Sequence, residues 1–166
     1  MKMTDYLAIY AAVLSTIVFL WNIAQSRPQV KVDFLFSIND ADGKPEPGGS
    51  IIVRNHSSHD VHLANIRILY PYRHVTFKER LGHLWRFRRW PSRVGWVHSS
   101  LSNYGIESGC PVCLEARKSF RIFIPDEKVK AMLADATEGS LMACVQDQLW
   151  NNFYSRKFRW AEPNTA

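Results

Sequence analysis

Residues 30–38 read VKVDFLFSI, and this stretch decides the fold class. Apolar and polar side chains alternate along most of it, which is the two-residue period of a strand with one buried face. Further short stretches of this kind lie at 51–53, 61–70, 119–124, 141–145 and 154–158. The polar segment 39–50 is rich in turn-forming residues and is expected to be a long loop. Short strands punctuated by turns predict an antiparallel β-sandwich, which we expect over 28–160.

The alternation also selects the side chains that face the core of this sandwich. The expected core residues are Val32, Phe34, Ile52, Leu63, Ile68, Phe120, Ile122, Val145 and Phe158. The pattern changes phase at Ala64 and Asn65, and this slip predicts a β-bulge.

Two short helical segments are expected to interrupt the strands. In residues 76–90, Thr76 and Glu79 make the pattern of a capping box, the apolar residues share one helical face, and Pro91 ends the helix. Residues 126–136 begin with two acids after a proline and predict a second helix across one end of the sandwich.

Upstream of the strands lies an uncharged run over residues 6–24, YLAIYAAVLSTIVFLWNIA. As a helix it spans about 28 Å, close to the hydrocarbon core of a bilayer. Tyr6 and Tyr10 at one end and Trp21 at the other are expected at the two membrane interfaces. A retained transmembrane helix is favoured over a cleaved signal peptide or a buried core helix. The expected organisation is an anchor over 1–27, the sandwich over 28–160 and a C-terminal tail over 161–166.

Length and charge fit one folded domain with an appendage, since the 166 residues include 21 Lys+Arg and 15 Asp+Glu. Residues 26–166 hold the whole net charge of +6, as 20 basic minus 14 acidic residues. Three cysteines are too few for a disulfide scaffold, and their odd number suits a reducing compartment. We therefore expect the domain on the cytoplasmic side of its membrane.

A basic, aromatic-rich insert over 72–103 contains the first of the two helices. Arginines beside tryptophan rings suit an anionic membrane surface or an acidic protein partner, and nucleic acid is the least favoured ligand. Alternatively, the helix covers an edge of the sandwich and its cations are solvated. The candidate binding residues are Lys78, Arg80, Trp85, Arg86, Arg88, Arg89 and Trp90.

One C-x-x-C pair, Cys110 and Cys113, is a candidate for metal or redox chemistry. A structural zinc site takes four ligands, and the other cysteine and the histidines lack the required spacing. The C-P-x-C sequence is similar to a glutaredoxin-type redox turn, but here the following residues read as a strand rather than a helix. We expect ordinary thiols and no cofactor.

The segment His56–Asp60, HSSHD, contains the residue types of a catalytic triad. Triads assemble from distant segments, so a polar hairpin turn is the better interpretation, and His59 with His62 would supply two metal ligands at most. We expect that the chain is not an enzyme.

Several sequence features together resemble those of a protein family. They are the N-terminal membrane helix, the alternating valines, Val53-Arg54-Asn55, Val61–Leu63, Leu114–Phe120, and Asp147 followed by Ser155–Arg159. The chain thereby resembles small bacterial single-pass membrane proteins with an immunoglobulin-like β-sandwich. The resemblance implies that fold, a bacterial inner-membrane location and no known catalytic residues.

Three functions are open on these observations. The leading one is a membrane-tethered binding or scaffold module that recognises a protein partner, a second copy of the chain or the anionic membrane surface. The second is an effector that perturbs the membrane, of the toxin or phage-defence type. The third is a redox or metal protein that uses the cysteine pair.

Overall fold

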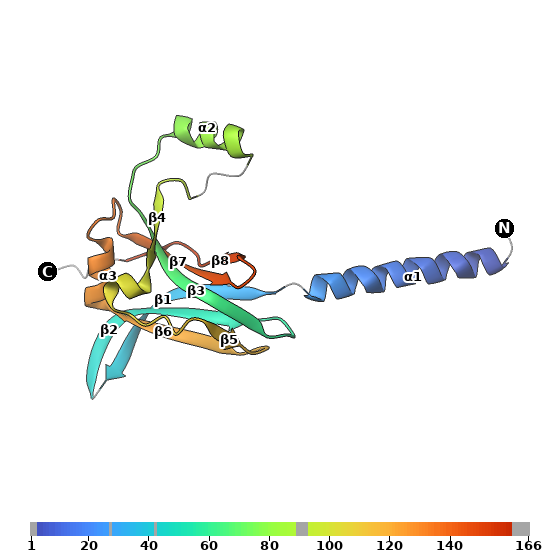
Figure 1. Cartoon of the computed structure of the whole chain (residues 1–166), viewed down its shortest axis with the longest axis horizontal. Coiled ribbons are helices and arrows are strands. Elements are labelled where there is room, and N and C mark those ends of the chain that lie inside the picture. The colour runs from blue at the N-terminus through green and yellow to red at the C-terminus, as the bar shows by residue number, and fades with distance from the viewer. Residues whose placement is uncertain (1–2, 27, 42, 89–92, 161–166) are drawn as a thin grey trace.

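The computed structural model describes residues 3–26, 28–41, 43–88 and 93–160, which form a long N-terminal helix followed by a mainly β domain (Figure 1). Helix α1 (Met3–Ser26) projects from one end of the domain. Within the described residues, one helical stretch, Met3–Ile23, is long and apolar enough to cross a membrane, and none of its most apolar window is buried. The expected N-terminal apolar helix and antiparallel strands are therefore both present.

The strands form two antiparallel sheets. One has the order β1-β2-β6, built from β1 (Val30–Ala41), β2 (Lys44–Asn55) and β6 (Ser119–Pro125). The other has the order β4-β3-β7-β8. Its strands are β4 (Trp96–Ser100), β3 (Val61–Pro71), β7 (Ser140–Asp147) and β8 (Asn152–Tyr154), while β5 (Val112–Leu114) pairs with β3 and β9 (Phe158–Arg159) pairs with β7.

The hydrophobic core takes side chains from both sheets. Val32, Phe34 and Ile51 come from the first sheet, and Ile66 and Val145 from the second. Among the residues whose burial is described, this cluster lies within 32–160 and includes none from α1. Burial of these apolar groups is the main force that holds the sheets together.

The core prediction for β2 is off by one residue. Ile51 and Val53 are buried, whereas Ile52 is only half-buried. The stretch of three consecutive apolar residues gave no alternation from which to choose the inward face. Phe120 and Phe158 were also expected in the core, but they are half-buried and pack against its edge.

The prediction of a long loop over residues 39–50 is wrong. Strand β1 continues to Ala41, and β2 pairs with it from Lys44 onward, so the polar residues extend a hairpin. This part of the hairpin runs past the core. Phe36 and Ile38 continue the alternation of the buried Val32 and Phe34, but they are exposed. Main-chain hydrogen bonds between β1 and β2 therefore keep this segment in strands, although its composition is typical of a loop.

Two irregularities interrupt the second sheet. The register of β3 against β7 shifts between Leu63 and Asn65, which confirms the predicted bulge. The strand expected around 154–158 is divided into β8 and β9 at Ser155. There the Ser155 hydroxyl oxygen accepts a hydrogen bond from the Ala143 N–H at 2.9 Å, in place of a main-chain carbonyl.

Two short helices accompany the strands. Helix α3 (Asp126–Leu133) follows β6 and buries Val129 and Met132 against the core; it ends three residues before the predicted Ala136. Helix α2 (Phe77–Phe87) connects β3 to β4 and ends before the predicted Trp90. A short 3-10 turn, η1 (Leu101–Tyr104), follows β4.

Candidate functional site: an exposed amphipathic helix

Helix α2 begins with the predicted capping box. The Glu79 N–H donates to the Thr76 hydroxyl oxygen at 3.4 Å, and the Thr76 N–H donates to the Glu79 carboxylate at 3.1 Å. At the other end, Arg88 adopts a left-handed conformation, with φ of 49°, and its N–H donates to the Leu84 carbonyl at 2.8 Å. Both ends are thus satisfied locally, so the helix needs no neighbouring element to cap it.

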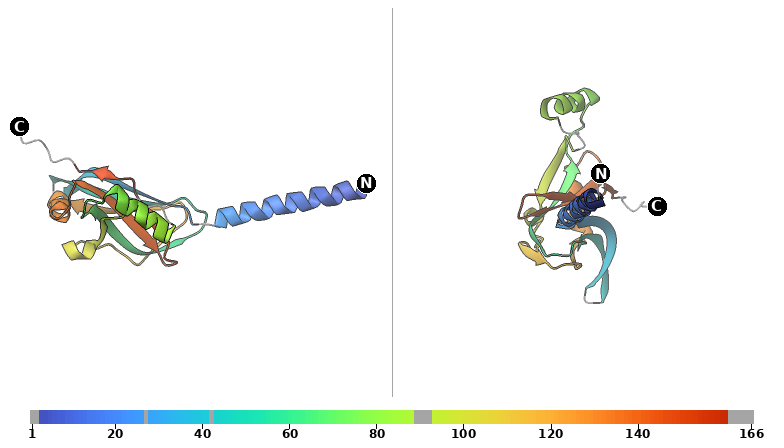
Figure 2. Two further views of the ribbon diagram at one scale, coloured as in Figure 1. Left: turned by 90° about the horizontal axis from the view of Figure 1, so that it is seen from above. Right: turned by 90° about the vertical axis from the view of Figure 1, so that its right-hand side faces the viewer.

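Helix α2 does not cover the sheet. No residue from Phe77 to Phe87 is buried, and Phe77 and Trp85 expose 79% and 86% of their surface. Figures 1 and 2 show the helix held away from the β domain, to one side of it. The alternative in which this helix packs over an edge of the sandwich is therefore wrong.

The apolar side chains of α2 form a row. Phe77, Leu81 and Trp85 are spaced four residues apart, which places them along one helical face, and all three are exposed. A row of large apolar residues left in water favours association with another apolar surface. We call Phe77, Leu81 and Trp85 the apolar row of α2.

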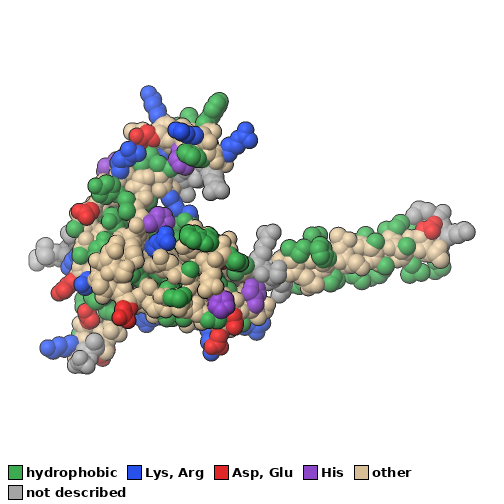
Figure 3. Space-filling view, in the orientation of Figure 1, with side chains coloured by type: hydrophobic (Ala, Val, Ile, Leu, Met, Phe, Trp, Pro, Cys, Tyr) green, Lys and Arg blue, Asp and Glu red, His purple; other side chains and the backbone are tan. Residues whose placement is uncertain are grey.

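Basic side chains surround this row, as Figure 3 shows for the visible face of α2. Lys78, Arg80, Arg86 and Arg88 are all exposed. The single acid of the helix, Glu79, is held in the capping box and lies 3.9 Å from Arg73. Four of the predicted basic residues are thus brought to one element. Arg89 and Trp90 lie outside the described residues.

A narrow neck joins α2 to the second sheet. The Tyr72 and Arg73 N–H groups both donate to the Gly95 carbonyl, at 3.0 and 3.3 Å. The Arg93 guanidinium stacks 3.1 Å from the centre of the Tyr154 ring on β8, which fixes the returning strand of the neck. These contacts hold α2 away from the domain while leaving its own residues uncovered.

The two thiols of the cysteine pair lie in different surroundings. Cys110 is half-buried, and this burial raises the pKa of its thiol, whereas Cys113 is exposed on β5. Burial likewise raises the pKa of Cys144. Catalytic thiols require a lowered pKa. Among the described residues, no three His, Cys, Asp or Glu side chains are grouped so that they could hold a metal ion.

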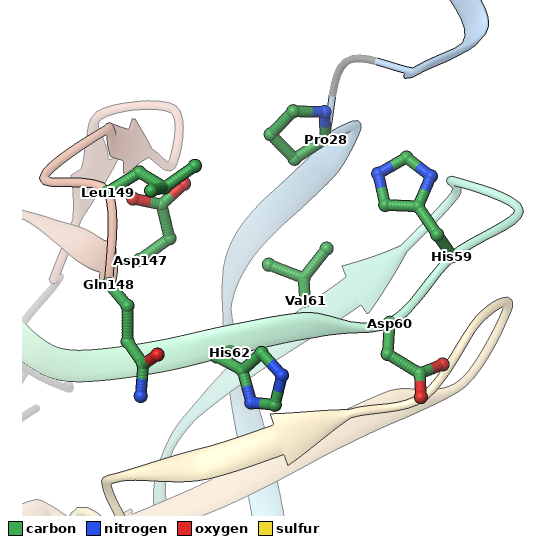
Figure 4. A pocket seen from close by; sticks show the side chains of 8 residues that line it. All are labelled: Pro28, His59, Asp60, Val61, His62, Asp147, Gln148 and Leu149. Carbon is green, nitrogen blue, oxygen red and sulfur yellow. The ribbon is translucent and has the colours of Figure 1, made fainter.

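The HSSHD segment forms the turn between β2 and β3. Ser57 is buried, and its hydroxyl lies within hydrogen-bond distance of Asn55 Oδ1 and of the His59 carbonyl, so it stabilises the turn. His59 lines a pocket of about 350 Å³, and His62 lines another part of it (Figure 4). Val61 lies between the two histidines, which therefore do not face each other.

This pocket is also lined by residues that are not among the candidate site residues predicted from the sequence. Pro28, Asp147 and Leu149 line it together with the histidines. Leu149 and its neighbour Trp150 are exposed in the turn between β7 and β8. In the sequence, the signal for this turn is an apolar pair, Leu149 and Trp150, with polar Gln148 before it and the turn-forming Asn151 after it.

The expected interface residues of α1 are accessible along the helix. Tyr6, Tyr10 and Trp21 are exposed, as are the other large apolar side chains from Leu7 to Ile23. Figure 3 shows apolar side chains along the visible face of α1.

Comparison with known proteins adds no functional assignment. No protein-family model and no curated protein matches the chain. Among solved structures, the chain is similar to one described as "X-ray structure of Northeast Structural Genomics Consortium target SoR45". The identity is 10%, the TM-score is 0.36, and the match covers 84% of this chain and 89% of that one. A likeness at this level carries no argument about function.

Proposed function

We propose that the chain is a single-pass protein of the bacterial inner membrane, with α1 across the bilayer and the β domain in the cytoplasm. The exposed apolar side chains of α1 support the membrane part of this proposal, because the domain covers none of its most apolar window. The net charge of +6 after the helix and the three free thiols support the cytoplasmic side.

We further propose that the domain is immunoglobulin-like. The sheet orders β1-β2-β6 and β4-β3-β7-β8 support this. They correspond to strands A-B-E on one sheet and C′-C-F-G on the other, which are found in immunoglobulin folds of the variable type. Helix α2 then occupies the connection between strands C and C′. Loops at strand ends commonly provide binding surfaces on such scaffolds.

The function that the site supports best is that of a membrane-tethered binding module whose α2 docks into a protein partner. The observation on which this rests is the apolar row of α2, which remains exposed although both helix ends are capped and the neck is fixed. Helices with apolar residues at four-residue spacing bind apolar grooves. The four exposed cations indicate acidic residues around that groove.

The position of α2 favours a protein over the membrane surface as its ligand. A helix bound at a membrane surface lies in the plane of the bilayer, at the level of the headgroups. In Figure 1, α2 lies to one side of the β domain and not at the end from which α1 departs.

Site-specific photocrosslinking in native membranes tests this function. A photoreactive residue at Leu81, within the apolar row, should form an adduct with one protein. The same residue at Gly82, which is exposed on a different side of α2, is the matched position and should form little or none. Replacement of Phe77 and Trp85 by serine should abolish the adduct at Leu81.

A second pair of substitutions controls for general apolar exposure. Phe36→Ser and Ile38→Ser remove exposed apolar groups from β1, far from the neck, and should leave the adduct unchanged. Adducts with lipid alone would favour the membrane-surface alternative, and depolarisation of the membrane on overexpression would favour the effector alternative. Either result, or no adduct at all, would overturn the proposed function.

A further inference from the structure

The end of the domain from which α1 departs contains a second exposed apolar feature. The β7–β8 turn lies at this end (Figure 1). Leu149, in this turn, lines the same pocket as Pro28, two residues after the end of α1 at Ser26 (Figure 4). The turn is therefore close to the point where the chain passes from helix to domain.

Leu149 and Trp150 are largely exposed, each over 78% of its surface. Neither belongs to the hydrophobic core. Tryptophan, with its apolar ring and polar N–H, favours the interface between lipid and water over either phase alone.

The turn that presents them is tightly held. Both oxygens of the buried Asp147 carboxylate accept hydrogen bonds from Asn151, one from its N–H and one from its side-chain amide, each at 2.8 Å. The Trp150 N–H donates to the Asp147 carbonyl at 3.1 Å, and the Gln148 N–H donates to the His62 carbonyl at 3.0 Å. The apolar pair is therefore displayed by a fixed scaffold.

Trp150 has a φ of 65°, in the left-handed region that residues with a large side chain seldom adopt. Glycine or asparagine would meet this backbone requirement with less strain. The hydrogen bonds of the turn hold Trp150 in this conformation.

We propose that Leu149 and Trp150 insert into the interfacial region of the bilayer that α1 spans, so that the domain is attached to the membrane at two points. This inference rests on the proposed membrane span of α1. With Trp21 at the interface, the five residues to Ser26 add about 7–8 Å of helix. The headgroup region is about 5–7 Å deep, so the end of the domain lies at its outer edge.

A second attachment point would restrict rotation of the domain about α1. The turn lies at the end of the domain, whereas α2 lies at its side (Figure 1). Insertion of Leu149 and Trp150 therefore leaves the apolar row of α2 accessible to a protein partner.

The test is fluorescence quenching of the full-length protein in nanodiscs that contain phosphatidylcholine brominated near the headgroup end of its acyl chains. Trp21 and Trp150 should be accessible to these lipids and Trp85 should not. Trp150→Asn, which suits the left-handed backbone, should lower the quenchable emission by about half if the two tryptophans contribute equally. Trp85→Asn is the matched control, since Trp85 is 86% exposed on α2, and should leave the quenchable emission unchanged.

The remaining outcomes separate this inference from the proposed function. If Trp21 is quenched and Trp150→Asn leaves the quenchable emission unchanged, the proposed insertion of the turn is wrong, while the proposed membrane span of α1 stands. If Trp21 is not quenched, the span itself is wrong. Protection of Trp150 by a second copy of the chain, seen as lost quenching together with a dimer by crosslinking, would also overturn the inference. Circular dichroism checks that each variant is folded.

Discussion

At the scale of single residues, Asn55 connects three parts of the chain. Its side-chain amide lies within hydrogen-bond distance of the carbonyls of His59, Leu114 and Glu115, at 2.8, 3.0 and 3.1 Å. Its Oδ1 accepts from the N–H and the hydroxyl of Ser57. Because Asn55 is 2% exposed, water cannot replace these partners.

Asn55→Asp should therefore destabilise the domain. The carboxylate cannot donate to the three carbonyls, and a buried unsatisfied polar group costs about 1–3 kcal/mol. Thermal unfolding in detergent should show a clearly lower midpoint. Asn103→Asp, at an exposed position in η1, is the control and should change the midpoint little. Equal midpoints for the two variants would contradict the structural role of Asn55.

His98 provides a pH-dependent prediction at the same scale. Partial burial lowers the pKa of His98 on β4, and the positive charges of Arg67 and Arg93 lower it further. In the unfolded chain the His98 ring binds a proton near pH 6.5, whereas in the folded chain it binds one only at lower pH. The contribution of His98 to stability is therefore full above pH 6.5 and is lost as the pH falls below it.

Proton NMR of the His98 ring, assigned with His98→Gln, measures this titration. Arg93→Gln should raise the pKa of His98 because it removes one of the two positive charges. It should not restore the ordinary value, since burial is the largest cause of the shift. A pKa at or above 6.5 in the unsubstituted protein would contradict the prediction.

At the scale of elements, the neck of α2 depends on Gly95. Its φ is 86°, and a Cβ added there would lie 2.7 Å from the Arg73 carbonyl oxygen. Gly95→Ala should therefore break the hydrogen bonds from Tyr72 and Arg73 to the Gly95 carbonyl. A non-glycine residue in this conformation costs about 1–2 kcal/mol before any clash.

Trypsin sensitivity measures the effect, because the insert is rich in lysine and arginine. Gly95→Ala should be cleaved faster within the insert while the sheets stay intact. Gly82→Ala is the matched control: Gly82 has open space around it in α2, and alanine should stabilise the helix by about 1 kcal/mol and slow cleavage. Equal cleavage of the two variants would show that the neck does not control the position of α2.

Elements governed by neighbouring residues could be predicted from the sequence, and those governed by distant pairing could not. The capping box of Thr76 and Glu79 is local, and the bulge at Ala64 and Asn65 is visible as a phase change. The choice between Ile51 and Ile52 for the core depends on the facing sheet. Likewise, the exposure of α2 depends on a neck whose two sides are about twenty residues apart in sequence. Contacts between such distant residues cannot be predicted from a periodic pattern.

At the scale of the whole molecule, exposed apolar side chains lie in three places besides the β1–β2 hairpin that carries Phe36 and Ile38. Helix α1 extends from one end of the domain, the turn with Leu149 and Trp150 lies at that same end, and α2 lies at the side. Helix α1 could be predicted from the length of its apolar run, and α2 from its amphipathic pattern. The role of the β7–β8 turn could not be predicted, because Leu149 comes close to Pro28 only when β7 and β8 fold beside β1.

This division predicts that the β domain folds without α1. As far as the structure describes the chain, the core lies within residues 32–160, so removal of residues 1–27 leaves its buried side chains in place. We expect a chain of residues 28–166 to give dispersed NMR spectra and to unfold cooperatively, within about 0.5 kcal/mol of the full-length protein. It should be lost from the membrane fraction, since one short turn gives far weaker binding than a spanning helix. An unfolded truncated chain would show instead that α1 stabilises the domain through contacts other than core burial.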